Sequence, residues 1–139
     1  MRTDSEAGQI SVLVLGLALI AFAVAGVAID GTRAFLFRRA LQDVADAAAL
    51  GGAGELDRQA YYRSGGRSVA VDDRAALSQV SRILAVRGLE ASAMIRVDDD
   101  AVAVVLRGEV PTTFLGVVGI AHIPVATEAR AAPFGGAPR

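Results

Sequence analysis

The sequence contains no cysteine and only one histidine among its 139 residues. The lack of cysteine excludes disulfides, cysteine nucleophiles and thiolate metal sites, and His122 has no second histidine with which to share a metal. The formal net charge is −1 and no long basic block is present, which disfavours nucleic-acid binding. Because no nucleophile elbow, metal-ligand spacing or phosphate loop occurs either, we expect no enzyme activity, cofactor, metal or small-molecule substrate.

Charge is also missing from one continuous stretch, Ala7 to Ile29. Within it, residues 10–29 would form a helix about 30 Å long, which is enough to cross the hydrocarbon core of a bilayer. A core helix of a soluble protein keeps one polar face toward water, whereas this segment is apolar on every side. We therefore predict a transmembrane helix over residues 10–29, with residues 1–9 as an N-terminal tail.

A cleaved signal peptide is the main alternative to a retained anchor. The triplet Ala23-Val24-Ala25 before Gly26 fits the small-x-small pattern of a signal peptidase site. Cleavage near Ala25 would release a secreted binding or adhesin-like module. The apolar run is longer than that of a usual signal peptide and the N-terminus is weakly basic, so retention is favoured.

The distribution of basic residues bears on the orientation of the predicted transmembrane helix. Arg2 precedes the apolar span, while Arg33, Arg38 and Arg39 follow it. By the positive-inside rule this distribution would keep the C-terminal part in the cytoplasm.

The helix is expected to continue beyond the span through residues 30–53, because this segment has strong helix formers and no proline, until glycines from Gly51 onward end it. Two stripes on this long helix are candidates for helix association. Small side chains, which let helix backbones approach closely, recur within the span at Ala18, Ala21, Ala25 and Ala28. Beyond it, an apolar stripe that either the protein's own sheet or neighbouring subunits must cover consists of Phe37, Leu41, Val44 and Ala48.

Residues 54–132 are expected to form a small α+β domain. After an irregular connector, Asp72 or Asp73 can cap a helix that runs to Arg87, with Gly88 as its C-cap. The buried stripe of this helix is expected to consist of Leu77, Val80, Leu84 and Ile83. Alternating apolar residues predict a hairpin of two strands around the turn Asp98-Asp99-Asp100. The predicted elements are a helix at 72–87, strands at 93–97 and 101–110, a short apolar helix at 114–120, a third strand at 123–131 and a flexible tail at 133–139. The fold class is α+β, in which a long N-terminal helix precedes a small domain of a helix on an antiparallel sheet.

Three further groups of residues have a structural and a functional interpretation. Asp30 either marks the end of the membrane segment or pairs with Arg33 or with a partner at the membrane surface. The three aspartates of the hairpin turn lack the glycine and the glutamate of a calcium loop, so a solvated turn explains them. Tyr61 and Tyr62 either anchor the connector or form an interface patch.

The N-terminal residues resemble the signature of the Tad (tight adherence) pilus-assembly proteins of the TadE/TadG-like family. The resemblance rests on Gly8-Gln9 before the apolar span, followed by the signature residues Asp30, Leu41, Gln42, Asp46 and Leu50. It implies a single-pass protein of the bacterial cytoplasmic membrane, either a pseudopilin-like TadE type or a short TadG type, with its C-terminal part outside the cytoplasm.

The implied role is structural, in a Tad-type (Flp) pilus or a related secretion apparatus. The implied partners are membrane lipid, other Tad subunits and, as an option, further copies of this chain. Pilin-like processing would cut after Gly8, but the glutamate usually found five residues further on is replaced by Leu13.

Overall fold

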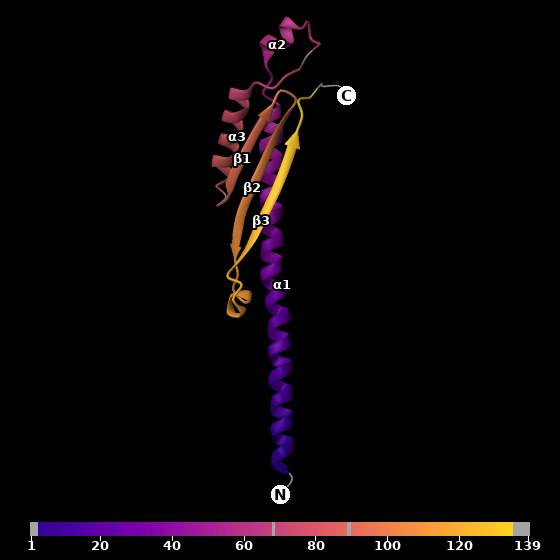
Figure 1. Ribbon diagram of the computed structural model, residues 1–139, viewed down its shortest axis with the longest axis vertical. Coiled ribbons are helices and arrows are strands. Elements are labelled where there is room, and N and C mark those ends of the chain that lie inside the picture. The colour runs from indigo at the N-terminus through magenta and orange to yellow at the C-terminus, as the bar shows by residue number, and fades with distance from the viewer. Residues whose placement is uncertain (1–2, 68, 89, 135–139) are drawn as a thin grey trace. The chain divides into compact units, whose positions relative to one another are not determined.

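The computed structural model describes residues 3–67, 69–88 and 90–134. Figure 1 shows the elements, which are in chain order α1 (Thr3–Ala53), α2 (Arg58–Arg63), α3 (Asp73–Arg87), β1 (Ser92–Asp98), β2 (Ala101–Pro111), the 3₁₀ helix η1 (Leu115–Val118) and β3 (His122–Ala131). The α+β class predicted from the sequence is confirmed.

The chain forms two compact units. The helical unit comprises residues 3–35 and 110–123, and the sheet unit comprises the other described residues, from 36 to 109 and from 124 onward. Helix α1 contributes its first part to the helical unit and its second part to the sheet unit.

Helix α1 has no proline between Thr3 and Ala53, and alanine and leucine dominate its composition, so nothing interrupts its backbone hydrogen bonds. It includes Gly51 and Gly52 and ends at Ala53: the Gly54 N–H donates to the Leu50 carbonyl at 3.1 Å and the chain then leaves the helix. Residues 3–9, expected as a tail, continue the helix, whereas Met1 and Arg2 lie outside the described residues.

The sheet is antiparallel with the order β1-β2-β3. Strands β1 and β2 form the predicted hairpin, in which Val97 pairs with Val102 and Asp98 pairs with Ala101 around the aspartate turn. Val102, Val104 and Leu106 are buried while Arg107 is exposed, which is the alternation that the sequence indicates for a strand with one covered face.

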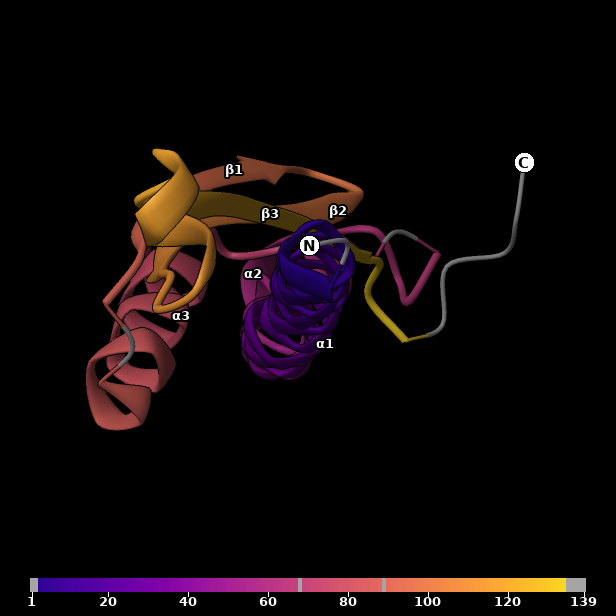
Figure 2. The same ribbon diagram turned by 90° about the horizontal axis from the view of Figure 1, so that it is seen from below.

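The core of the sheet unit lies between this sheet face and two helices. Figure 2 shows α3 and α1 on the same side of the strands. At Gly52 of α1 an added Cβ would lie 2.8 Å from Val80 Cγ2 of α3 and 3.1 Å from Val102 Cγ1 of β2, so the lack of a side chain here lets the three elements pack closely. The largest fully buried side chains of this unit are Leu41, Val80, Val102, Val104 and Leu106.

Both ends of α3 follow the sequence prediction. The Asp72 carboxylate accepts hydrogen bonds from the N–H groups of Arg74 and Ala75, and Gly88 closes the helix with a positive φ of 58°. The buried face differs from the expected one, because Ala76 and Val80 point inward while Leu77, expected in the stripe, is 43% exposed. Ala76 and Val80 are one helical turn apart and share one face of α3. The buried face therefore contains Ala76 in place of its neighbour Leu77.

Beyond β3 the sequence predicts a flexible tail. Pro133 is buried and Phe134 is exposed, and residues 135–139 of that segment lie outside the described residues.

Candidate functional site at the end of the apolar helix

Asp30 is the most unusual side chain of the helical unit, because its charged group is only 1% exposed. Its carboxylate accepts three backbone hydrogen bonds: Oδ1 from the Thr113 N–H at 3.0 Å, and Oδ2 from the Phe114 and Leu115 N–H groups at 2.9 and 2.8 Å. A buried carboxylate is stable only when such donors replace water. Asp30 therefore holds a segment that lies more than 80 residues further along the chain.

The segment held by Asp30 is the β2–β3 loop, which we define as residues 112–121. Its ends are closed by the Thr112 N–H, which donates to the Ala121 carbonyl at 3.0 Å, and its middle forms η1. The residue at the N-cap position, Phe114, has no side chain that could accept the free N–H groups of the first turn. Asp30 supplies this cap from another element.

Apolar contacts on α1 continue the attachment of the loop. The ring of Phe114 lies edge-to-face with that of Phe22, with ring centroids 5.3 Å apart and an interplanar angle of 63°. At Gly26, which is buried, an added Cβ would lie only 2.7 Å from the Phe114 Cβ. The glycine thus leaves room for the loop backbone to approach the helix.

Arg33, three residues after Asp30 on α1, also contacts the β2–β3 loop. Its Nη1 donates to the Thr113 hydroxyl at 3.0 Å, and within the described residues no ion pair joins it to Asp30. Asp30 lies just after the apolar span. The pKa of its carboxyl is lowered, mainly by the hydrogen bond from the Leu115 N–H. Burial opposes this shift, while the Thr113 and Phe114 N–H groups and the Arg33 charge reinforce it.

The apolar span itself is almost bare. In the part of the chain that the structure describes, α1 is the one helix long and apolar enough to cross a membrane, and only 6% of its most apolar 18-residue window is buried within the protein. The four alanines of the predicted association stripe are all exposed, and they are Ala18, Ala21, Ala25 and Ala28.

The second predicted stripe lies in the sheet unit and is covered there. Leu41 and Ala48 are fully buried and Val44 nearly so, while Phe37 is half-buried. At Gly108 of β2 an added Cβ would lie 2.9 Å from the Phe37 ring, so this ring packs directly on the strand.

Two of the family-signature residues attach α1 to the sheet. Gln42 Nε2 donates to Asp46 Oδ1 at 3.0 Å, one helical turn away, and to the Glu128 carbonyl of β3 at 3.3 Å. Leu41 is in the core, whereas Leu50 is exposed and the structure gives no reason for a leucine there. The signature residues therefore belong to both units: Asp30 lies in the helical unit, and the signature residues from Leu41 to Leu50 lie in the sheet unit.

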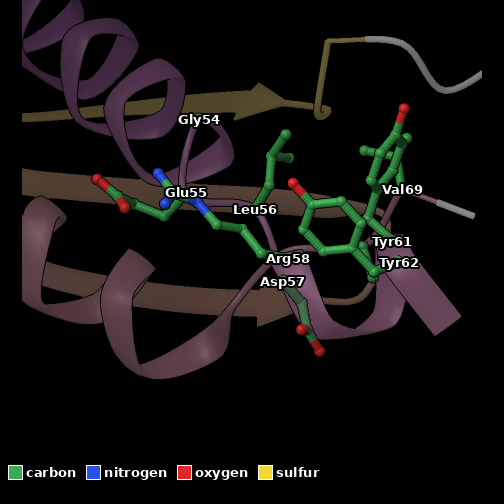
Figure 3. Close-up of a pocket in the computed structure, with 9 residues that line it drawn as sticks. Gly54, Glu55, Leu56, Asp57, Arg58, Tyr61, Tyr62 and Val69 are labelled. Carbon is green, nitrogen blue, oxygen red and sulfur yellow. The ribbon is translucent and has the colours of Figure 1, made fainter. Parts of the chain in front are cut away.

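The remaining candidates do not converge on a site. Tyr61, Tyr62 and Leu56 line a hollow of about 300 Å³ (Figure 3). The two tyrosine rings lie edge-to-face with their centroids 5.8 Å apart. In the hairpin turn Asp100 Oδ1 lies 4.0 Å from Arg130 Nη2 of β3, and both side chains are exposed. His122 is exposed at the start of β3, and no group of three metal-ligating side chains occurs among the residues described.

Sequence reasoning singled out Asp30 but missed the residues that it meets. Phe22, Phe114 and Leu115 carried no expectation beyond their own helices, and Gly26 was considered only as the residue after a possible cleavage site. Arg33 was one of two possible partners of Asp30, beside the interpretation of Asp30 as the end of the membrane segment. The available signal was the uncharged stretch from Val110 to Ala121, which is too apolar for an ordinary surface loop.

Comparison with known proteins gives one match, in the N-terminal part of the chain. Residues 8–55 match the family model described as putative Flp pilus-assembly TadE/G-like, which confirms the resemblance seen in the sequence. The match contains the apolar span, Asp30 and the remaining signature residues, and it ends just after α1. No protein with curated function and no solved structure gives a significant match.

Proposed function

We propose that this chain, whose residues 8–55 match the TadE/G-like pilus-assembly family model, is a membrane-anchored structural or assembly component of a Tad-type (Flp) pilus or a related secretion apparatus. The observation that carries the proposal is the span 10–29, which lies within the family match and is almost entirely exposed apart from its contact with the β2–β3 loop. An apolar helix with no protein around it is stable in lipid, where its own backbone hydrogen bonds satisfy every polar group. The role is structural, and no catalytic step is proposed.

Lateral helix association is the proposed mode of action within the membrane. The exposed stripe of Ala18, Ala21, Ala25 and Ala28 presents small side chains along one side of the span. Such a stripe lets a second helix approach closely enough for extensive van der Waals contact. The partners would be the transmembrane helices of other Tad subunits or of further copies of this chain.

A matched pair of variants tests this mode. Ala21→Leu places a large side chain on the stripe, and Ala23→Leu adds the same volume to an exposed position of the span that lies off the stripe. Energy transfer between labelled copies in membranes should fall for Ala21→Leu and remain near the wild-type value for Ala23→Leu. Equal behaviour of the two variants would show that copies of this chain do not associate through the stripe.

We place the C-terminal part outside the cytoplasm, as the family resemblance implies, although the arginine count argues for the opposite side. One of these arginines, Arg33, is bound to Thr113, so its position has a structural reason that is independent of orientation. This contact weakens the argument from the positive-inside rule.

A secreted module released near Ala25 is the alternative. Cleavage there would remove Phe22 and expose the face of Phe114 that packs against it. The buried position of Gly26 inside a continuous helix supports retention of the span.

Membrane fractionation combined with protease protection of a C-terminally tagged chain separates these possibilities. A full-length membrane-bound chain whose tag is digested from outside the cell agrees with the proposal. A protected tag would place the C-terminal part in the cytoplasm, and a shortened soluble product would favour the secreted module.

A further inference from the structure

The β2–β3 loop carries apolar side chains that the protein itself does not cover. Val117 is 76%, Val118 is 73% and Ile120 is 49% exposed. No charged residue occurs between Glu109 and Glu128. The hydration of a charged side chain therefore does not offset the unfavourable exposure of the loop's apolar surface to water. Exposed apolar side chains gathered on one short loop indicate a surface that is covered by something else.

The level of the loop along α1 indicates what covers it. Phe114 contacts Phe22, which precedes Asp30 by eight residues, or about 12 Å along a helix. Phe22 and Gly26 both belong to the apolar span 10–29. The loop therefore lies beside the last two turns of the segment that is proposed to cross the membrane.

Seven backbone N–H groups of the loop have hydrogen-bond partners within the protein, which favours its entry into lipid. Non-helical backbone can enter a membrane only where its N–H and C=O groups are satisfied within the protein. The N–H groups from Thr112 to Leu115 bind Ala121 and Asp30, and those of Val117, Gly119 and Ile120 bind carbonyls of the loop itself. The hydroxyl of Thr112 donates to the Ile120 carbonyl.

We propose that the β2–β3 loop is a second lipid-contacting element, immersed in the membrane beside the end of the apolar span, with Val117, Val118 and Ile120 facing lipid and Asp30 satisfying the loop backbone from α1. This inference rests on the proposed membrane anchoring of residues 10–29. The occupant of the apolar surface is lipid because the loop is continuous with the apolar surface of the span at the same level.

The absence of cysteine allows a direct test with single-cysteine variants of the full chain in lipid nanodiscs. Val118→Cys carries an environment-sensitive fluorophore in the loop, and Val117→Cys provides a second loop position in case the first disturbs folding. Val86→Cys is the matched aqueous control, because Val86 is 80% exposed on α3 beside Arg82 and Arg87. Leu17→Cys reports on the span itself.

Each label is quenched in turn by iodide from water and by nitroxide-bearing lipids. We expect the label at Val118 to follow that at Leu17, with strong quenching by lipid and several-fold weaker quenching by iodide than at Val86. If the Leu17 label is in lipid but the Val118 label is quenched by iodide as strongly as the Val86 label, the loop is aqueous and this inference is overturned while the anchor stands.

A Val118 label that neither quencher reaches would show that protein, such as a second copy, covers the loop, which also overturns the inference. A Leu17 label that iodide reaches would overturn the proposed anchor and the lipid-contacting loop together.

Discussion

The most direct test of the attachment between the loop and α1 is the substitution Gly26→Ala. The added Cβ would lie 2.7 Å from the Phe114 Cβ, which is bonded directly to the backbone and cannot rotate away, so the loop itself must move. Gly16→Ala is the matched control, because it is the same change in the same apolar span with no atom within 4 Å of the new Cβ.

The size of the effect follows from comparing the docked and undocked loop. Alanine favours helix over glycine by about 1 kcal/mol, but α1 is helical whether or not the loop is docked, so this gain cancels. Overpacking by one methyl group costs about 1–3 kcal/mol, and only the docked state carries this cost. The equilibrium for loop docking should therefore fall by roughly 5- to 150-fold in Gly26→Ala and stay unchanged in Gly16→Ala.

Hydrogen–deuterium exchange of the full-length protein in nanodiscs measures this equilibrium at the amides of Thr113, Phe114 and Leu115, which are free to exchange only when the loop leaves Asp30. Faster exchange in Gly26→Ala, with wild-type rates in Gly16→Ala, is the expected result. Equal exchange in both variants would refute the reasoning, because it would mean that the loop does not depend on close approach to Gly26.

Three further changes test the site and the core. Asp30→Ala should speed exchange at the same three amides more than Asp30→Asn, which keeps one acceptor oxygen. Because folding lowers the pKa of this carboxyl, its contribution to docking is complete above the unfolded value of 3.8 and is lost as the pH falls through the lower folded value, which the fluorescence of a Val118→Cys label can follow. Gly52→Ala should destabilise the sheet unit by about 1–2 kcal/mol in urea unfolding, because the cost of overpacking exceeds the gain in helix propensity. Gly51→Ala is the control: its new Cβ would be too close only to the flexible end of Ile83, so the change in stability should be near zero. Thr127→Val should stabilise the protein by about 1 kcal/mol in the same assay, because within the described residues the buried Thr127 hydroxyl has no hydrogen-bond partner.

The helices and strands of this protein were largely predictable because their signals are local. The apolar span, the continuation of α1 to the glycines at 51–54, the Asp72 and Gly88 caps and the β1–β2 hairpin each depend on neighbours within about ten residues. Leu77 was placed on the wrong face because the short periodic pattern of α3 allows the inward face to be Leu77 with Val80 and Leu84, or Ala76 with Val80.

The stripe of Phe37, Leu41, Val44 and Ala48 shows where local pattern stops being informative. Its periodicity predicts that something covers it, but the same periodicity would serve a neighbouring subunit or the protein's own strands. In the structure Leu41, Val44 and Ala48 are buried in the sheet unit, and Phe37 packs on Gly108.

The sequence by itself therefore determined that one helix is apolar enough to enter a membrane, that it continues without a break to residue 53, and that a small α+β domain follows. Only the tertiary structure decided the role of Asp30, because its three donors lie 83 to 85 residues away and no periodicity links them to it. A charged residue at the end of an apolar helix has the same local sequence whether water or a distant backbone satisfies it. The choice between the two depends on how the chain returns to the helix, which is set by the summed packing of the whole fold.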